Sequence, residues 1–245
     1  MPAMRSSFRL KWIPLIAMAL VITTAISLGN WQTRRAEEKL AIEQAVAARS
    51  QLAPLNAASI PPGQQPEEFR RVTAEGEFIA DWPLYIENRP HGAQSGFYLM
   101  MPLRIADSGD VVLVARGWFP RDPADRTRVP DVPVPAGRQR IEGSVRSHAT
   151  RVMQLGDAST VKPGAILQNI DPASFAAASG LHTQAFIIEQ LNDTHDGLVR
   201  DWPAPSAGVD KHRGYAFQWY ALAAAAFLFY LITGIRSARK RHEQT

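Results

Sequence analysis

The stretch WIPLIAMALVITTAISLG at Trp12–Gly29 and the stretch YAFQWYALAAAAFLFYLITGI at Tyr215–Ile235 decide the fold of this chain. Neither stretch contains a charged residue. As helices that rise about 1.5 Å per residue, they would be about 27 and 32 Å long, which matches a hydrocarbon core about 30 Å thick. The sequence therefore predicts one transmembrane helix near each end of the chain.

Charge predicts the orientation of these helices. The short tails 1–11 and 236–245 each carry a net charge of +3, and the residues between them carry −2, within a total of +4. Because positive tails stay in the cytoplasm, we expect both termini there and residues 30–214 on the outer side, the periplasm of a bacterial inner (cell) membrane. Arg34 and Arg35, just past the first span, favour the opposite orientation but are outnumbered. The negative middle gives no basic patch for nucleic acid.

The chain has no cysteine. This excludes disulfide bonds, thiolate metal sites and covalent attachment of a c-type haem. The domain at residues 30–214 is long enough to bury a core without such links.

An alternative for the first stretch is a cleaved signal peptide, because Ala25-Ile26-Ser27 resembles a small-residue cleavage site. However, the apolar stretch is longer than the apolar region of a signal peptide, about 7–15 residues, and the helical pattern continues beyond it. We therefore expect a retained helix.

The sequence between the two spans predicts a β-rich domain. Residues 30–49 lack Gly and Pro and predict a helix that continues from the first span. After a Pro-rich connector, seven short runs of β-branched and aromatic residues predict strands at 71–79, 82–88, 96–105, 111–119, 138–146, 165–170 and 184–191.

Three connections also have recognisable patterns. We expect a hairpin turn at 107–110, a long Pro-rich loop at 120–137, and a short helix at 172–179 between the N-cap Asp171 and Gly180. The chain is thus predicted to be an α+β membrane protein. Two transmembrane helices would flank a β-rich extracytoplasmic domain, built as a partly open barrel.

A series of motifs, in this order and spacing, resembles the Surfeit locus protein 1 family. The motifs are GNWQTRR at 29–35 followed by Lys39, RRV at 70–72 with GEF at 76–78, NRP at 88–90, GFY at 96–98 with PL at 102–103, VARGWFP at 114–120, and His212 followed by YAFQWYALA at 215–223. The resemblance covers nearly the whole chain. In one departure, Asp210 and Lys211 stand where the family usually has asparagines.

The resemblance implies an assembly factor for haem–copper terminal oxidases, chiefly the aa3-type cytochrome c oxidase. Bacterial members of the family are linked to the supply of haem a to oxidase subunit I. The family histidine that matches His212 is the proposed haem ligand. The partners implied are subunit I, and also haem a synthase.

The residues around His212 suit a haem ligand. His212 lies about one turn before the second span, and on a helix Tyr215, Ala216 and Trp219 would share its face. An imidazole above a membrane-embedded aromatic strip suits an amphipathic macrocycle whose iron needs an axial nitrogen. The alternative is an interfacial histidine beside an ordinary aromatic belt.

Residues of the first span are expected at the same depth. Gly29, Trp31 and Gln32 end that span on the outer side, so they would lie level with His212 and Trp219. The small residues of Ala25-x-x-x-Gly29 and Ala221-x-x-x-Ala225 would let the helices pack closely and form one site. Trp31 is equally interpretable as an interfacial anchor.

Four arginines are candidates for binding haem propionates, because guanidinium binds carboxylates in a bidentate manner: Arg35, Arg89, Arg116 and Arg213. The alternative for each is an ordinary ion pair. Gly96 and Gly117 are better explained by backbone geometry than by chemistry.

The sequence gives little support for a copper site or for an enzyme active site. The remaining histidines have no metal-ligand spacing, and Met100 and Met101 would face opposite sides of a strand, which disfavours a copper chaperone. No hydrolase, zinc-protease or phosphate-loop motif is present, which disfavours a hydrolase or transferase. We therefore expect a non-enzymatic protein that binds haem a transiently. The alternative is a scaffold that stabilises immature subunit I and binds no cofactor.

Overall fold

The computed structural model describes residues 4–125, 127–149, 160–203 and 208–242, with the side chains of 4–11 and 237–242 left out. The tail residues 1–3 and 243–245 lie outside the described residues. The chain forms two compact units. The helix unit comprises Met1–Gln44 and Ala204–Thr245, and the barrel unit comprises Ala45–Pro203.

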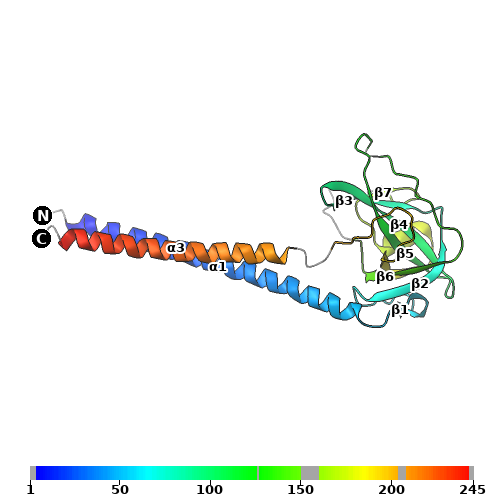
Figure 1. The fold of residues 1–245 in the computed structure, drawn as a ribbon, viewed down its shortest axis with the longest axis horizontal. Helices are drawn as coiled ribbons and strands as arrows, with labels where there is room; N and C mark the ends of the chain where they lie inside the picture. Colours follow the sequence, from blue (N-terminus) through cyan, green and yellow to red (C-terminus); the bar gives the residue numbers. More distant parts are fainter. Residues whose placement is uncertain (1–3, 126, 150–159, 204–207, 243–245) are drawn as a thin grey trace. The chain divides into compact units, whose positions relative to one another are not determined.

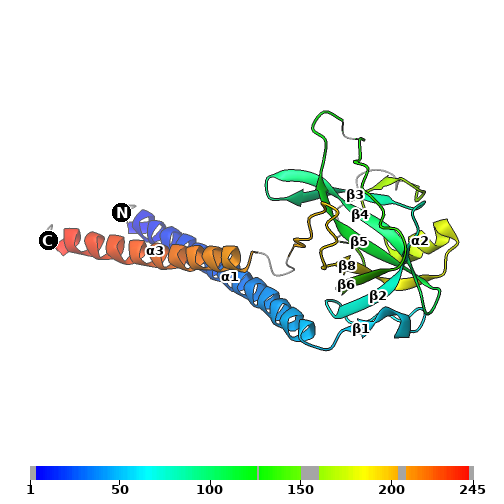
Figure 2. The same cartoon turned by 45° about the vertical axis from the view of Figure 1, so that its right-hand side comes forward.

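The helix unit contains two long helices, α1 (Met4–Ser50) and α3 (Val209–His242). They run antiparallel, so that the N-terminal end of α1 and the C-terminal end of α3 lie together (Figures 1 and 2). Both are long and apolar enough to cross a membrane, and only 11% of the most apolar window of each is buried. A core helix of a soluble protein would be mostly buried instead. The helix predicted at residues 30–49 is confirmed as part of α1.

Small residues on α1 form its contact with α3. Ala25 and Ala36 are buried. A Cβ atom added to Gly29 would lie 2.6 Å from the ring of Tyr220, so only glycine allows this approach. The predicted role of Ala25 and Gly29 in close helix packing is therefore confirmed.

On α3 the predicted packing face is wrong. Ala216 and Ala223 are buried against α1, whereas Ala221 and Ala225 are exposed. Two positions along a helix differ by about 200°, so Ala221 and Ala225 lie on the side of α3 opposite to Ala223.

The barrel unit contains short and long strands. Their bounds are β1 (Leu55–Asn56), β2 (Arg71–Phe78), β3 (Leu84–His91), β4 (Gln94–Ile105), β5 (Val111–Pro120), β6 (Gln139–Arg146), β7 (Ile166–Leu167) and β8 (Thr183–Gln190). Six of the predicted strands are confirmed, and the predicted run 165–170 is reduced to β7. Strand β1 and the 3-10 turn η1 (Ala57–Ser59) were not predicted.

Strands β2, β6, β8, β5 and β4 of the described chain pair in this order as a mixed barrel, and all five are labelled in Figure 2. Only β5 and β8 run parallel within it. The ring closes where β2 pairs with β4 at Gly76, Glu77 and Phe78. Because this seam is paired at those three positions alone, the predicted partly open barrel describes it well. The sheet continues beyond the ring, with β1 beside β2, and β3 and β7 beyond β4.

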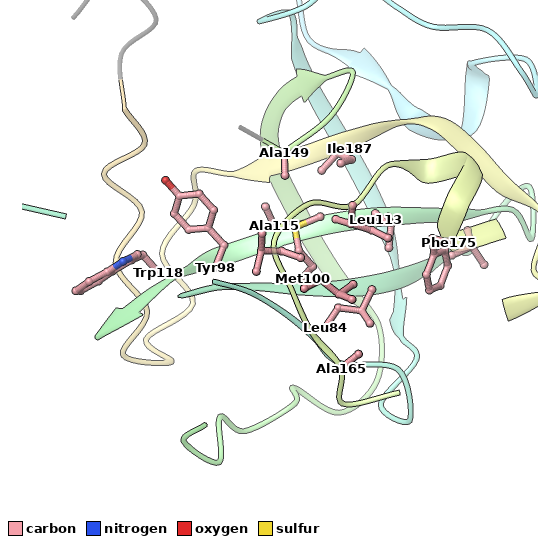
Figure 3. Close-up of a cluster of buried hydrophobic side chains, with 14 residues drawn as sticks. Leu84, Tyr98, Met100, Leu113, Ala115, Trp118, Ala149, Ala165, Phe175 and Ile187 are labelled. Carbon is pink, nitrogen blue, oxygen red and sulfur yellow. The ribbon is translucent and has the colours of Figure 1, made fainter. Parts of the chain in front are cut away.

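Alternating residues of β5 divide the core into two layers. Val112 and Val114 point into the barrel, where residues from all five strands meet. Leu113 and Ala115 point outward, into a second cluster with β3, β4 and the helix α2 (Pro172–Ser179). Figure 3 shows Phe175 of α2 in this second cluster. Strand β5 is therefore buried on both faces, which explains the continuous apolar run Val111–Ala115 at its start.

The predicted hairpin turn, the short helix and the backbone role of Gly96 are confirmed. Strands β4 and β5 pair across the turn at 107–110, and Gly109 has a positive φ of 75°. Asp171 caps α2 by accepting a hydrogen bond from the backbone N–H of Ser174, and Gly180 ends α2 in the left-handed conformation. A Cβ on Gly96 would lie 2.2 Å from the backbone oxygen of Phe119, so Gly96 does serve backbone geometry.

Candidate functional site

His212 is joined to the first helix by a hydrogen bond. Its Nδ1 lies 2.7 Å from Oε1 of Gln32 in a half-buried contact. Because an amide oxygen only accepts, the ring N–H at Nδ1 is the donor. In the neutral imidazole this contact selects the tautomer with the proton on Nδ1 and leaves the lone pair on Nε2, which has no hydrogen-bond partner among the described residues. The contact brings α1 and α3 together at the predicted depth.

A second polar contact joins the helices about two turns further along α3. The hydroxyl of Tyr220 donates to Oδ1 of Asn30 at 2.8 Å and lies 3.4 Å from Oγ1 of Thr33. Thr33 in turn donates to the backbone oxygen of Gly29 at 3.0 Å. The Tyr220 side chain thus contacts three residues of α1, namely Gly29, Asn30 and Thr33.

The predicted aromatic residues are placed differently from one another. Trp219 is half-buried, whereas Tyr215 and Trp31 are about half exposed, at 53% and 51%. Successive helical residues differ by about 100°, so Tyr215 and Trp219 project on the same side of the α1–α3 contact as His212. Trp31 projects away from that contact. The structure therefore brings Tyr215 and Trp219, but not Trp31, to the His212 side.

The two predicted arginines of the helix unit lie on opposite sides of the α1–α3 contact. Nη1 of Arg35 pairs with Oε2 of Glu38 at 2.8 Å, and both side chains are exposed. The helical geometry places Arg35 on the same side as Gln32 and His212. Arg213 lines a groove on the other side.

The two candidate arginines of the barrel unit are buried, and their guanidinium groups bind other residues of that unit. Arg89 is 2% exposed and donates to the backbone oxygens of Glu87 and Gln168. Arg116 is 1% exposed, and its Nη2 lies 2.9 Å from Oδ2 of Asp196. The propionate role is wrong for both, because neither guanidinium is accessible to a ligand. The alternative of an ion pair holds for Arg116.

Asp196 lies between two buried arginines. Its Oδ2 is 2.9 Å from Nη2 of Arg116 and 2.7 Å from Nη2 of Arg200. Burial alone would raise the pKa of Asp196, but hydrogen bonds from Arg200 and from the backbone N–H of Leu198 hold this pKa below its usual value. Burial lowers the pKa of Arg116 and outweighs the opposing effect of Asp196. This network therefore holds the barrel together rather than a ligand.

A groove with a volume of about 360 Å³ opens between α1 and α3. Its walls are mostly apolar: Thr33, Ala36, Leu40, Ala216, Phe217 and Tyr220. Glu37 and Arg213 also line it. Thr33 follows Gln32 by one position, about 100° around the helix, so the groove lies on the side away from His212.

The chemistry of the His212 side suits a haem ligand. A ligating histidine usually donates its other ring N–H to a nearby oxygen, as His212 does to Gln32. Nε2 is the nitrogen left for iron, and the aromatic side chains of Tyr215 and Trp219 lie on the same side. Within the described ranges, no three His, Asp or Glu side chains gather as a metal site.

Two residues of this site were missed in the sequence. Both Tyr220 and Asn30 belong to the quoted motifs, but neither was predicted to have a role in the site. Both lie at positions where an aromatic or polar residue is common at a membrane interface, and only the closeness of Gly29 to Tyr220 identifies the pair.

Comparison with known proteins finds one family model and several relatives that are similar to this chain. The family model described as "SURF1 family" matches residues 19–224. A "SURF1-like protein" of Rickettsia felis is 24% identical over 223 residues, which are 89% of this chain and 95% of the relative. "Surfeit locus protein 1" of Mus musculus is 30% identical over 233 residues, 88% of this chain and 72% of the relative. "Cytochrome oxidase assembly protein SHY1" of Saccharomyces cerevisiae is 28% identical over 97 residues, 38% of this chain and 24% of the relative.

Proposed function

This chain belongs to the SURF1 family, and from that membership we propose that it is an assembly factor for cytochrome oxidase of the aa3 type. The printed name of the yeast relative, a cytochrome oxidase assembly protein, supports the general role. The finer role proposed here is that the protein binds haem a transiently and helps to insert it into oxidase subunit I. It is not an enzyme in this proposal. Subunit I and haem a synthase are its proposed partners.

One observation carries the haem proposal, namely the hydrogen bond from Nδ1 of His212 to Gln32. It orients the ring and keeps Nε2 free for an axial bond. Haem a supplies the iron that this nitrogen would bind and the propionates that need a cation. Tyr215 and Trp219 would flank the macrocycle, and Arg35, on the same side, would hold a propionate. An exposed pair such as Arg35–Glu38 contributes about 1 kcal/mol or less, so Arg35 can exchange its partner.

We place this site at the outer interface of a bacterial inner membrane. The antiparallel helices bring both charged tails to one side, and the positive-inside rule makes that side the cytoplasm. Residues 12–29 and 215–235 would span the membrane, the tails 1–11 and 236–245 would be cytoplasmic, and residues 30–214 would lie in the periplasm.

The competing proposal is a scaffold that stabilises immature subunit I without a cofactor. To distinguish the two, the oxidase is purified from cells that carry wild-type protein or His212→Ala in place of the chromosomal copy. A haem carrier predicts subunit I that lacks haem a in the variant. A scaffold predicts normal haem content, and that result would contradict the carrier function.

A further inference from the structure

We propose that the groove between α1 and α3 binds one molecule of phosphatidylethanolamine. The headgroup would lie between Glu37 and Arg213, and an acyl chain would run from there past Ala216, Phe217 and Tyr220 toward the second span. The proposal rests on the membrane-spanning role of the two helices, and it is independent of haem binding.

The walls of the groove suit a flexible apolar chain. Ala36 and Ala216 are buried and too small to fill the space between the helices, while Leu40, Phe217 and Tyr220 form its sides. Phe217 is 73% exposed, although it belongs to an apolar helix. The volume of about 360 Å³ lies at the lower end of the range for ligand pockets, about 300–1,000 Å³. This is room for part of one acyl chain, not for a whole lipid.

The charges at the groove select the headgroup. Within the described ranges, neither Glu37 nor Arg213 forms an ion pair or a side-chain hydrogen bond, although Arg35 and Glu38 nearby pair with each other. One groove thus presents an unpaired anion and an unpaired cation. A phosphate beside a primary ammonium complements this arrangement, because Arg213 can bind the phosphate and Glu37 can accept hydrogen bonds from the ammonium.

Other common headgroups match less well. The trimethylammonium group of phosphatidylcholine has no N–H to donate to Glu37. The headgroup of phosphatidylglycerol has no cation, so it would leave Glu37 facing an anionic lipid. Phosphatidylethanolamine is therefore the lipid that the two side chains favour.

The groove and the His212 side are separate. Glu37 and Arg213 project on the side of the α1–α3 contact opposite to Gln32 and His212, because neighbouring helical positions differ by about 100°. A lipid in the groove would leave Nε2 of His212 free. The helix contact would then carry a structural lipid on one side and the haem ligand on the other.

The test uses the haem-free full chain in nanodiscs that contain equal amounts of phosphatidylethanolamine, phosphatidylcholine and phosphatidylglycerol. Native mass spectrometry after release counts the lipids that stay bound. We expect one retained lipid, with phosphatidylethanolamine enriched about fivefold over each of the others. Because no haem is present, a failure of the haem proposal would leave this result untouched.

Charge variants identify the site. Glu37→Gln should abolish the preference over phosphatidylcholine, and Arg213→Gln should reduce retention of all three lipids. Glu38→Gln and Lys211→Gln are matched controls on other sides of the same helices and should behave like the wild type. Equal retention of the three lipids by the wild type, enrichment of phosphatidylglycerol, or equal effects of Glu37→Gln and Glu38→Gln would overturn the proposal.

A larger side chain in the groove tests whether an acyl chain lies there. Ala216→Leu places a larger side chain in the groove and should reduce the amount of retained phosphatidylethanolamine. Ala221→Leu adds the same volume on the exposed side of α3 and should retain the lipid. Full retention by Ala216→Leu would also contradict the proposal.

Discussion

Nδ1 of His212 and Oε1 of Gln32 lie 2.7 Å apart, although 180 positions separate the two residues in the chain. The bond connects the start of the second apolar helix to the end of the first span. It also assigns each ring nitrogen a role, because Nδ1 donates and Nε2 stays available. The proposed function depends on this division.

The first prediction concerns Gln32. Replacement by leucine removes the acceptor for Nδ1, so the ring loses both its orientation and its fixed tautomer. Loss of such a supporting partner typically costs about 10–100-fold in metal affinity. We expect Gln32→Leu to weaken binding of haem a by at least about tenfold in a spectral titration of the purified protein. Gln44→Leu, an exposed position on the same helix, serves as the control. Unchanged affinity in Gln32→Leu would show that the hydrogen bond does not support a ligand.

The second prediction concerns Gly29. A methyl group at this position would lie 2.6 Å from the Tyr220 ring, so the ring must move and give up its 2.8 Å hydrogen bond to Asn30. We expect Gly29→Ala to destabilise the helix pair by about 1 kcal/mol or more, measured by SDS titration in mixed micelles. Gly234 has no atom within 4 Å of an added Cβ. Gly234→Ala should therefore be neutral or stabilising, by up to about 1 kcal/mol. Equal effects of the two substitutions would argue against the close contact at Gly29.

The third prediction concerns the buried network around Asp196. The variant Asp196→Asn leaves Arg116 and Arg200 buried without their shared counter-charge. Removal of one partner of a buried pair typically costs about 3–5 kcal/mol. We expect a loss of that order in the free energy of unfolding of the barrel, measured by urea titration of the full chain. Asp193 also pairs with Arg200 but is exposed, so Asp193→Asn should cost about 1 kcal/mol or less. Similar losses in the two variants would contradict the assigned role of Asp196.

The fourth prediction is a pH dependence from the same carboxylate. The folded-state pKa of Asp196 lies below its unfolded value of about 3.9. Its contribution to stability is therefore fully present above the unfolded pKa and is lost as the pH falls through the folded pKa. We expect unfolding free energy to decrease below about pH 4 more steeply in the wild type than in Asp196→Asn. Parallel curves in that acid range would show that Asp196 does not titrate as assigned.

Much of the barrel was predictable because its strands have strong local patterns. Val111–Ala115 is a continuous apolar run at the start of β5, and Gly109 marks the preceding hairpin turn. Strand β1 was missed because Leu55–Asn56 is too short to show a period and depends on pairing with Val72 and Thr73. The order of the strands in the ring was not predictable, since it depends on long-range pairings that no local pattern records.

The level of the candidate site along the two helices was predictable, but the helix face that forms the contact was not. The lengths of the two apolar stretches placed Gln32 level with His212, and the structure joins them. The packing face of α3 was misassigned because Ala221 and Ala223–Ala226 are alike, so their order contains no amphipathic signal. Arg116 was a reasonable ligand candidate in sequence, because nothing local indicates that Asp196 will neutralise it from 80 positions away.

The most direct test of haem binding by His212 is the absorption spectrum of the protein purified from cells that make haem a, compared between the wild type and His212→Ala. We expect the spectrum of bound haem a in the wild type and its loss in the variant. Equal haem in the two proteins, or none in either, would contradict the role of His212 as the haem ligand and favour a scaffold that acts without a cofactor.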